Sequence, residues 1–315
     1  MSSDLTSTPA SPRTASLGAS LLSHAARDVT ALRCAIVQWR RDGLRVALTP
    51  TMGALHEGHL GLIRTARAWG ADRVVASIFV NPTQFGPTED FDAYPRDTPR
   101  DADLLAGAGC DLLYLPQASA MYPPGFATEV RVTGLTDRLC GAARPGHFDG
   151  VALVVSKLLL QAGADMAVFG EKDWQQLAVI RRLTSDLDIP TQIVGAPTER
   201  DADGLALSSR NAYLTAAERA VAPRLHGALQ DAAAAIREGR RPEDACAEAR
   251  SALLEVGFSK VDYFSALDGE TLDPLAVGSA TTASERDATL SQARLFAAAH
   301  LGRARLIDNI AIPLA

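Results

Sequence analysis

The sequence predicts an α/β protein: a doubly wound, Rossmann-like parallel sheet at the N-terminal side, followed by a smaller α+β domain. Between about residues 28 and 198, apolar runs alternate with segments of helical periodicity, which is typical of a parallel sheet flanked by helices. The run from Val74 to Val80 is apolar throughout, as expected of a strand covered on both faces. Past residue 198, Ala-, Glu- and Arg-rich helical segments and alternating strands replace this pattern.

Caps, periodicity and turn residues place the elements of the first domain. Asp28 or Thr30 caps a helix ending at Arg41, and Pro50 with Gly53 marks the loop after the first strand. Further helices are expected at about 58–69, 99–107, 148–161 and 174–187, and strands at about 45–49, 74–80, 111–115 and 166–169. The first domain is therefore predicted to span residues 28–198.

The second domain, residues 199–315, is predicted to contain helices at 216–238 and 242–256 and strands at 260–267 and 303–312. The stretch 277–287, rich in Ser, Thr and Ala, is interpreted as a mobile insertion. Residues 1–27 contain seven serines, three threonines and a single acidic residue, and we expect a disordered tail. The same composition is compatible with a transit peptide, although only two arginines are present.

Charge, cysteines and hydropathy exclude several classes of protein. A net charge of −6 argues against a protein that coats nucleic acid. The four cysteines form no CxxC pair, so the sequence indicates neither a zinc knuckle nor a dithiol site, and a reducing compartment, the cytoplasm, is expected. The longest apolar run, 151–160, falls short of the ~20 residues of a membrane span. We therefore expect no membrane and no nucleic-acid partner.

The stretch from Pro50 to Leu60, PTMGALHEGHL, carries the clearest chemical signal. It leaves a strand and opens a helix, where free backbone N–H groups favour phosphate. His56 and His59 are three residues apart and so share one helix face, where two imidazoles can donate hydrogen bonds to phosphate oxygens. Metal ligation is a weaker alternative because the pair is not HExxH and no third ligand is obvious. A structural role for both histidines also stays open.

Three other stretches contain candidate ligands. Ser208, Ser209 and Arg210 can wrap polyphosphate oxygens, or one serine can simply cap a helix. The turn FGEKD places Lys172 as a point charge for phosphate, or is an ordinary solvated turn. Gln84 and Gln176 offer both donors and acceptors, which suits a small hydroxy-acid, although loop glutamines are common.

Taken together, these motifs resemble one family, the pantoate–β-alanine ligases. Six blocks match in order from about residue 31 to the end: PTMGALHEGH, SIFVNPTQF, RPGHFDGV, FGEKDWQQ, DGLALSSRN and RLIDNIAI. This family belongs to the HxGH nucleotidyltransferases, relatives of the class I aminoacyl-tRNA synthetases. The resemblance implies a Rossmann-like domain that binds nucleotide and pantoate, a C-terminal lid domain and a homodimer.

The resemblance also implies the site residues. His59, beside His56, is the expected general acid at the α-phosphate, and Lys172 is the third catalytic residue. Gln84 and Gln176 are expected to bind pantoate, and Gln84 also β-alanine. The implied ATP site comprises Met52, Gly53, Ala54, Leu55, His56, Glu57, Gly58, His59, Gly170, Glu171, Lys172, Asp173, Glu199, Leu207, Ser208, Ser209 and Arg210. Glu199 departs from the valine usual in the family at the adenine, and Leu207 from its methionine.

The implied reaction condenses (R)-pantoate with β-alanine at the expense of ATP through a pantoyl adenylate, giving pantothenate, AMP and pyrophosphate. Mg²⁺ is expected to accompany the ATP phosphates, and no protein ligand for a metal is assigned. The alternative within enzymes is a nucleotidyltransferase that joins ATP to another small acceptor. A nucleotide sensor without catalysis is a rival of a different class, but it does not need His56, His59 and Lys172 together.

Overall fold

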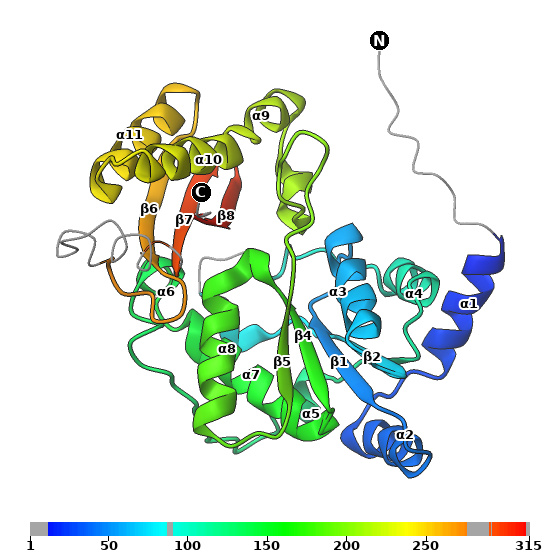
Figure 1. Ribbon diagram of the computed structural model, residues 1–315. Helices are drawn as coiled ribbons and strands as arrows, with labels where there is room; N and C mark the ends of the chain where they lie inside the picture. The colour runs from blue at the N-terminus through cyan, green and yellow to red at the C-terminus, as the bar shows by residue number, and fades with distance from the viewer. Residues whose placement is uncertain (1–11, 87–90, 276–289, 291, 313–315) are drawn as a thin grey trace.

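The expected doubly wound α/β fold is confirmed by the computed structural model, which describes residues 12–86, 91–275, 290 and 292–312 (Figure 1). Its centre is a five-stranded sheet in the order β3-β2-β1-β4-β5, and every neighbouring pair is parallel. The strands are β1 (Val46–Thr51), β2 (Arg73–Ile78), β3 (Leu112–Tyr114), β4 (Met166–Gly170) and β5 (Gln192–Ala196).

Helices cover both faces of this sheet. One core lies beneath α2 (Val29–Arg41), α7 (His147–Ala162) and α8 (Trp174–Asp186), and the other beneath α1 (Pro12–Ser23), α3 (Glu57–Ala68) and α4 (Thr98–Gly107). Val46 and Leu48 of β1 join the first core and Ala47 the second, because successive side chains of a strand point to opposite faces. Burial on both faces explains the continuous apolar runs of the sequence. Two short helices, α5 (Ala118–Met121) and α6 (Leu139–Ala143), lie between β3 and α7.

The strand order creates a crevice at the carboxyl edge of the sheet. The chain moves outward from β1 to β3 on one side and from β4 to β5 on the other, so the order reverses between β1 and β4. Ligands of such sheets bind outside the strand ends at this reversal. The HEGH turn follows β1, η1 (Pro82–Gln84) follows β2 shortly afterwards, and η2 (Glu171–Asp173) follows β4. Three motif-bearing turns therefore lie at one edge.

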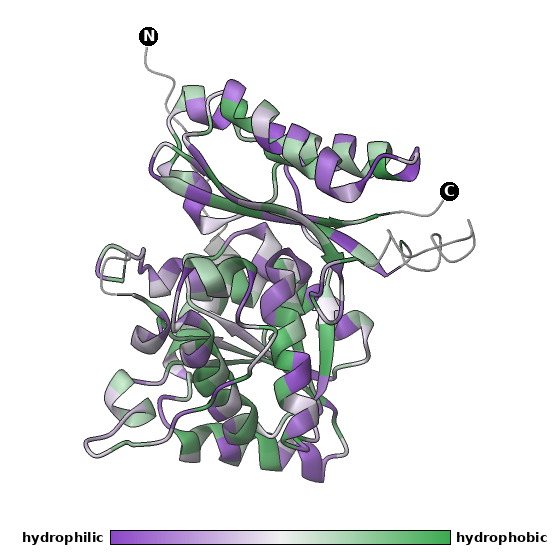
Figure 2. Ribbon diagram, turned by 90° about the vertical axis from the view of Figure 1, so that its left-hand side faces the viewer, coloured by the Kyte–Doolittle hydropathy of each residue, from purple (hydrophilic) through white to green (hydrophobic). Residues whose placement is uncertain are grey.

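The C-terminal part forms a second layer against that edge. After η3 (Ser209–Tyr213) come α9 (Ala216–Val221), α10 (Arg224–Arg237) and α11 (Pro242–Glu255). An antiparallel sheet follows, with β6 (Lys260–Asp268), β7 (Ala293–Leu301) and β8 (Ala304–Ala311) in that order. Helices α10 and α11 pack on one face of this sheet, and its other face is turned toward the parallel-sheet domain (Figure 2). The expected boundary near residue 198 falls just after β5.

The structure corrects the expectation of a disordered tail over residues 1–27. Residues 12–23 form helix α1, which packs against α4 with Leu21 buried. Ala26 is also buried, and it donates to the Leu113 carbonyl and accepts from Leu115 N–H beside β3. The high serine content led to the expectation of disorder, although Leu21 and Ala26 make apolar contacts. Residues 1–11 lie outside the described residues. Among the described helices, none has the length and apolar character needed to cross a membrane.

Other differences concern the C-terminal half. The helix expected over 216–238 is divided into α9 and α10 at Pro223, whose ring nitrogen has no hydrogen to donate. Strands β5 and β7 were not predicted. The centre of β7 is Ala297 to Ala299, a residue type depleted in strands, and burial between β6 and β8 stabilises it there. The insertion expected at 277–287 lies outside the described residues.

Candidate active site

A buried carboxylate shapes the turn after β1. Gly53 and Ala54 have φ angles of +84° and +52°, in the left-handed region that favours glycine. Asp101 of α4 is 1% exposed and accepts hydrogen bonds from the N–H groups of Ala54 (2.9 Å) and Leu55 (2.8 Å). These two amides therefore face Asp101 rather than the crevice, although the ATP loop was expected to run continuously from Met52 to His59.

The two histidines form the start of α3. His56 is the N-cap residue, and its Nδ1 accepts from the N–H of Gly58 at 3.2 Å. The Nδ1 of His59 accepts from the N–H of His56 at 3.3 Å, and the ring centroids are 4.1 Å apart. Because each Nδ1 is an acceptor, the proton of each neutral ring is placed on Nε2. Both rings are thus fixed as Nε2–H donors by the capping of their own helix.

Burial keeps both imidazoles neutral at pH 7. Desolvation lowers the pKa of His56 to about 4, with a further contribution from the Lys172 ammonium. Desolvation also lowers the pKa of His59 to about 3, and the adjacent His56 ring adds to this effect. An anion beside the rings would shift both pKa values upward, since it favours the charged form. An anion that binds beside the two rings would therefore favour their protonated forms.

Lys172 enters the crevice from the turn after β4. Its side chain is 18% exposed, and Nζ lies 3.8 Å from the Asp173 carboxylate. The backbone of this turn is held from the other domain, because Asn309 of β8 donates Nδ2–H bonds to the carbonyls of Glu171 (3.0 Å) and Lys172 (2.9 Å). Asn309 is itself 4% exposed, so this contact is a buried junction between the two sheets.

The segment from Arg200 to Arg210 is also attached to β8. Arg200 makes a two-pronged contact with Asp308, at 2.6 and 2.9 Å. Ser208 caps η3 by accepting from the N–H of Arg210 at 3.3 Å. The capping role that the sequence left open for Ser208 or Ser209 is thus present for Ser208. Ser208 also lines the crevice.

One cavity of about 230 Å³ brings most of the expected site residues together. His56, His59 and Lys172 line the same space, although 113 residues or more separate the histidines from the lysine in the chain. The lining includes the following expected residues: Met52, His56, Gly58, His59, Gln84, Gly170, Lys172, Asp173, Gln176, Glu199, Leu207, Ser208, Ser209 and Arg210. The three catalytic candidates therefore lie in one crevice.

Five residues of the expected ATP site lie outside this lining: Gly53, Ala54, Leu55, Glu57 and Glu171. Leu55 is 1% exposed and belongs to the core, while Glu57 pairs with Arg64 at 2.5 Å on the surface of α3. The unusual Glu199 is compensated as well, because its carboxylate lies 3.1 Å from the same Arg64. Its backbone carbonyl accepts from the N–H of Leu207 at 2.9 Å, so residue 199 borders the cavity without an unpaired charge.

Sequence reasoning missed the residues that orient Gln84. Asn81 is 1% exposed and donates from Nδ2 to Oε1 of Gln84 at 3.2 Å, while Tyr122 donates to Oδ1 of Asn81 at 2.8 Å. The VNPTQ stretch could have indicated this role, because an asparagine before proline at a strand end is a typical turn residue whose side chain can form hydrogen bonds. Gln176 lines the cavity, whereas its neighbour Gln175 is buried. Gln175 accepts from the N–H of Cys140 in α6 and donates to the carbonyls of Leu135 and Arg138 in the loop before it.

The fold and this crevice are typical of one class of protein, the nucleotide-binding α/β enzymes, with paired histidines and a distant lysine gathered where the strand order reverses. Comparison with known proteins makes the assignment specific. A family profile described as pantoate-beta-alanine ligase matches residues 24–311. The chain belongs to the pantoate–β-alanine ligase family. The rival assignment, nucleotide transfer to a different small acceptor, is not favoured.

Individual relatives cover nearly the whole chain. The pantothenate synthetase of Paramagnetospirillum magneticum is 55% identical over 289 residues, 92% of this chain and 98% of the relative. That of Mesorhizobium japonicum is 56% identical over 91% of this chain and 97% of its own. A crystal structure of pantothenate synthetase from Thermus thermophilus matches with a TM-score of 0.80 and 45% identity, covering 92% of this chain and 99% of its own.

A further solved structure contains ligands. It is a pantoate–β-alanine ligase from Francisella tularensis, described as complexed with beta-gamma ATP and β-alanine. It matches with a TM-score of 0.72 and 30% identity over 91% of this chain and 97% of its own.

Proposed function

We propose that this chain condenses (R)-pantoate with β-alanine to pantothenate through a pantoyl adenylate, consuming ATP and releasing AMP and pyrophosphate. The observation that carries the proposal is the shared cavity, in which His56, His59 and Lys172 meet Gln84 and Gln176. The cationic and imidazole groups suit a phosphate, and the two amides suit a hydroxy-acid. The ligands of the Francisella tularensis relative support the same assignment.

In the first half-reaction the pantoate carboxylate attacks the α-phosphorus of ATP, and pyrophosphate leaves. His56 and His59 donate Nε2–H bonds to the phosphoryl oxygens, where negative charge develops. Bound ATP raises both pKa values, so His59 can also carry a proton to the departing oxygen as the expected general acid. Lys172 supplies a fixed positive charge beside them, and Ser208, Ser209 and Arg210 enclose the outer phosphates.

Mg²⁺ would reach the site with ATP. The described residues include no group of three or more His, Cys, Asp or Glu side chains that could hold a metal ion. We expect Mg²⁺ to be held mainly by phosphate oxygens and water. The ion would neutralise phosphate charge. The Asp173 carboxylate, 3.8 Å from Nζ of Lys172, would then be available to the ribose.

In the second half-reaction the amine of β-alanine attacks the acyl carbon of the adenylate, the amine loses a proton, and AMP leaves. Asn81 fixes the rotamer of Gln84, so that the amide can orient both the pantoyl hydroxyls and the incoming amine. The mixed anhydride hydrolyses readily, and exclusion of water therefore falls to the C-terminal domain as a lid over residues 28–198. A homodimer and a cytoplasmic location complete the proposal; the four unpaired cysteines accord with a reducing compartment.

The test is a turnover assay with the whole chain. AMP and pantothenate are expected only when ATP, pantoate and β-alanine are all present. Mass spectrometry of an incubation with ATP and pantoate alone should detect the acyl adenylate. Formation of AMP with pantoate replaced by another acid, and none with pantoate, would refute the substrate assignment.

A further inference from the structure

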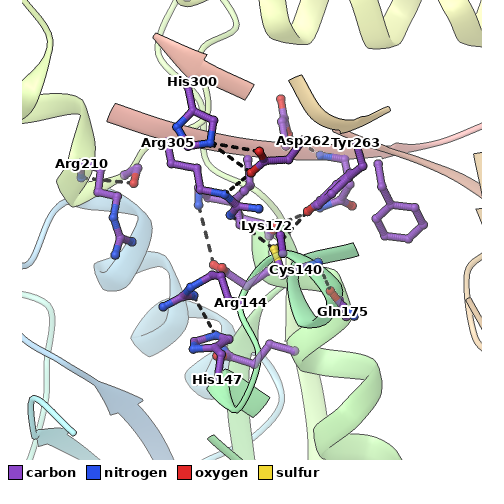
Figure 3. A pocket seen from close by; sticks show the side chains of 18 of the residues that line it. Cys140, Arg144, His147, Lys172, Gln175, Arg210, Asp262, Tyr263, His300 and Arg305 are labelled. Carbon is purple, nitrogen blue, oxygen red and sulfur yellow. Dashed lines mark hydrogen bonds and ion pairs between the residues drawn. The ribbon is translucent and has the colours of Figure 1, made fainter. Parts of the chain in front are cut away.

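A second, larger cavity adjoins the nucleotide crevice. It has a volume of about 530 Å³ and lies between the parallel-sheet domain and the open face of the C-terminal sheet (Figure 3). Five residues line both cavities: Lys172, Asp173, Gln176, Ser208 and Arg210. The two spaces are therefore continuous around the segments expected to hold the outer phosphates of ATP.

The wall of this cavity concentrates positive charge in an acidic protein. Six Lys and Arg residues line it against three Asp residues, although the whole chain has a net charge of −6. One of the three carboxylates, that of Asp308, is already paired with Arg200, which lies outside the lining. Such a concave, basic surface attracts and concentrates anions.

Three basic residues of the C-terminal sheet stand in one row. Lys260 of β6 is paired in register with His300 of β7, and His300 with Arg305 of β8. Residues opposite each other on neighbouring strands share a face. The sheet therefore places two cationic side chains and an imidazole together on the cavity wall.

A single carboxylate organises this row. Asp262 contacts Lys260 (2.8 Å), His300 (3.1 Å) and Arg305 (2.8 Å). Burial alone would raise the pKa of Asp262, but the hydrogen bonds from these three residues hold it well below its usual range. One negative charge thus anchors the row without neutralising it. Within the described residues, Nη2 of Arg305 is buried and has no hydrogen-bond partner, so a donor is left over.

We propose that the Lys260–His300–Arg305 row, together with Arg303 at the neighbouring hairpin, is a second anion site, which takes the pyrophosphate released in the first half-reaction. The inference rests on the proposed function. A polyphosphate fits better than a carboxylate, because the cavity is large, is charged on both walls and begins where the β- and γ-phosphates would end. In Figure 3, His300 and Arg305 lie at the C-terminal sheet, Arg144 lies below them and Arg210 to one side.

The binding test substitutes exposed residues, so that Asp262 keeps its contacts with His300 and Arg305. Lys260→Gln and Arg303→Gln are combined, and pyrophosphate is titrated calorimetrically into the whole chain with AMP saturating. The matched control, Arg240→Gln with Arg241→Gln, removes the same charge from exposed positions of the same domain that do not line the cavity. We expect the Kd for pyrophosphate to rise about tenfold or more in the first pair and less than about twofold in the control, because screening limits distant charges.

Two results would overturn the inference. The first is an equal Kd for pyrophosphate in the two double variants. The second is weakened binding of pantoate, titrated alone in the same buffer, without weakened binding of pyrophosphate, since the row would then serve a carboxylate. The titration needs no turnover, so it fails separately from the proposed function. If the chain makes pantothenate but the Lys260 and Arg303 substitutions leave the Kd for pyrophosphate unchanged, only the second site is refuted. If the Kd changes as expected but the chain makes no pantothenate, only the proposed reaction is refuted.

Discussion

Replacing Asp101 tests whether one buried carboxylate holds the histidine-bearing turn in its working shape. Asp101→Asn keeps the size of the side chain. Its amide NH₂, however, must face one of the two backbone N–H groups that now donate hydrogen bonds to the carboxylate. Loss of one hydrogen bond to a charged acceptor costs about 1.5–3 kcal/mol. Burial raises the pKa of Asp101, so removing the charge relieves part of that cost. We expect the free energy of unfolding to fall by about 1–3 kcal/mol.

The functional effect should exceed the effect on folding. Ala54 has a φ of +52° and depends on its bond to Asp101, so the turn relaxes and displaces His56 and His59. A displacement of about 1 Å at a reacting centre can cost about 10²-fold in rate. Pantoate-dependent exchange of pyrophosphate into ATP is therefore expected to fall about 10²-fold, at substrate concentrations where the variant is folded.

Asp97→Ala provides the matched control. Asp97 caps the same helix, α4, by accepting from the N–H of Arg100, and it is exposed. Its loss should cost about 1 kcal/mol of stability and leave exchange within about twofold. The reasoning is wrong if Asp101→Asn loses stability by urea unfolding but keeps the exchange rate of the unsubstituted chain.

Three further predictions follow from the site. His59→Ala should lower pyrophosphate exchange about 10²- to 10⁴-fold while far-UV circular dichroism stays unchanged; exchange near the original rate would remove His59 from the chemistry. Because the folded pKa values of His56 and His59 are lowered to about 4 and 3, the unfolded chain binds protons first, and stability falls as pH drops below about 6.5. The loss should be on the order of 2 kcal/mol per histidine between pH 6.5 and 4.5, and His56→Gln with His59→Gln should flatten the urea-unfolding profile there. ATP should protect residues 204–211 from proteolysis, and equal cleavage with and without ATP would argue against a closing lid.

Local signals in the sequence were sufficient for the fold and for the turns that carry the site. The apolar run of β2, the Asp28 cap of α2 and the HEGH turn each depend on residues close together in the chain. The sheet order then follows from general rules for parallel strands, which place these turns at one edge.

The supports of the site could not be predicted, because they join distant segments. Asp101 reaches the turn after β1 from 46 and 47 residues away, and Asn309 reaches Lys172 from 137 residues away. A single buried carboxylate or amide leaves no periodic pattern, and its partner is a backbone group of any residue type. Helix α1 was not predicted for a related reason, because its burial depends on contact with α4 rather than on its own composition.

Strand β8 explains why the C-terminal sheet belongs to the site rather than merely covering it. Asp308 and Asn309 are neighbours, and successive side chains of a strand point to opposite faces. One therefore fixes Arg200, at the root of the segment leading to Ser208, and the other fixes the turn that carries Lys172. A displacement of β8 would therefore move both segments, which we expect to face phosphate, at the same time. Both the nucleotide crevice and the adjoining basic cavity therefore depend on β8, and under the proposed function we expect release of pyrophosphate and opening of the C-terminal domain to be coupled through this strand.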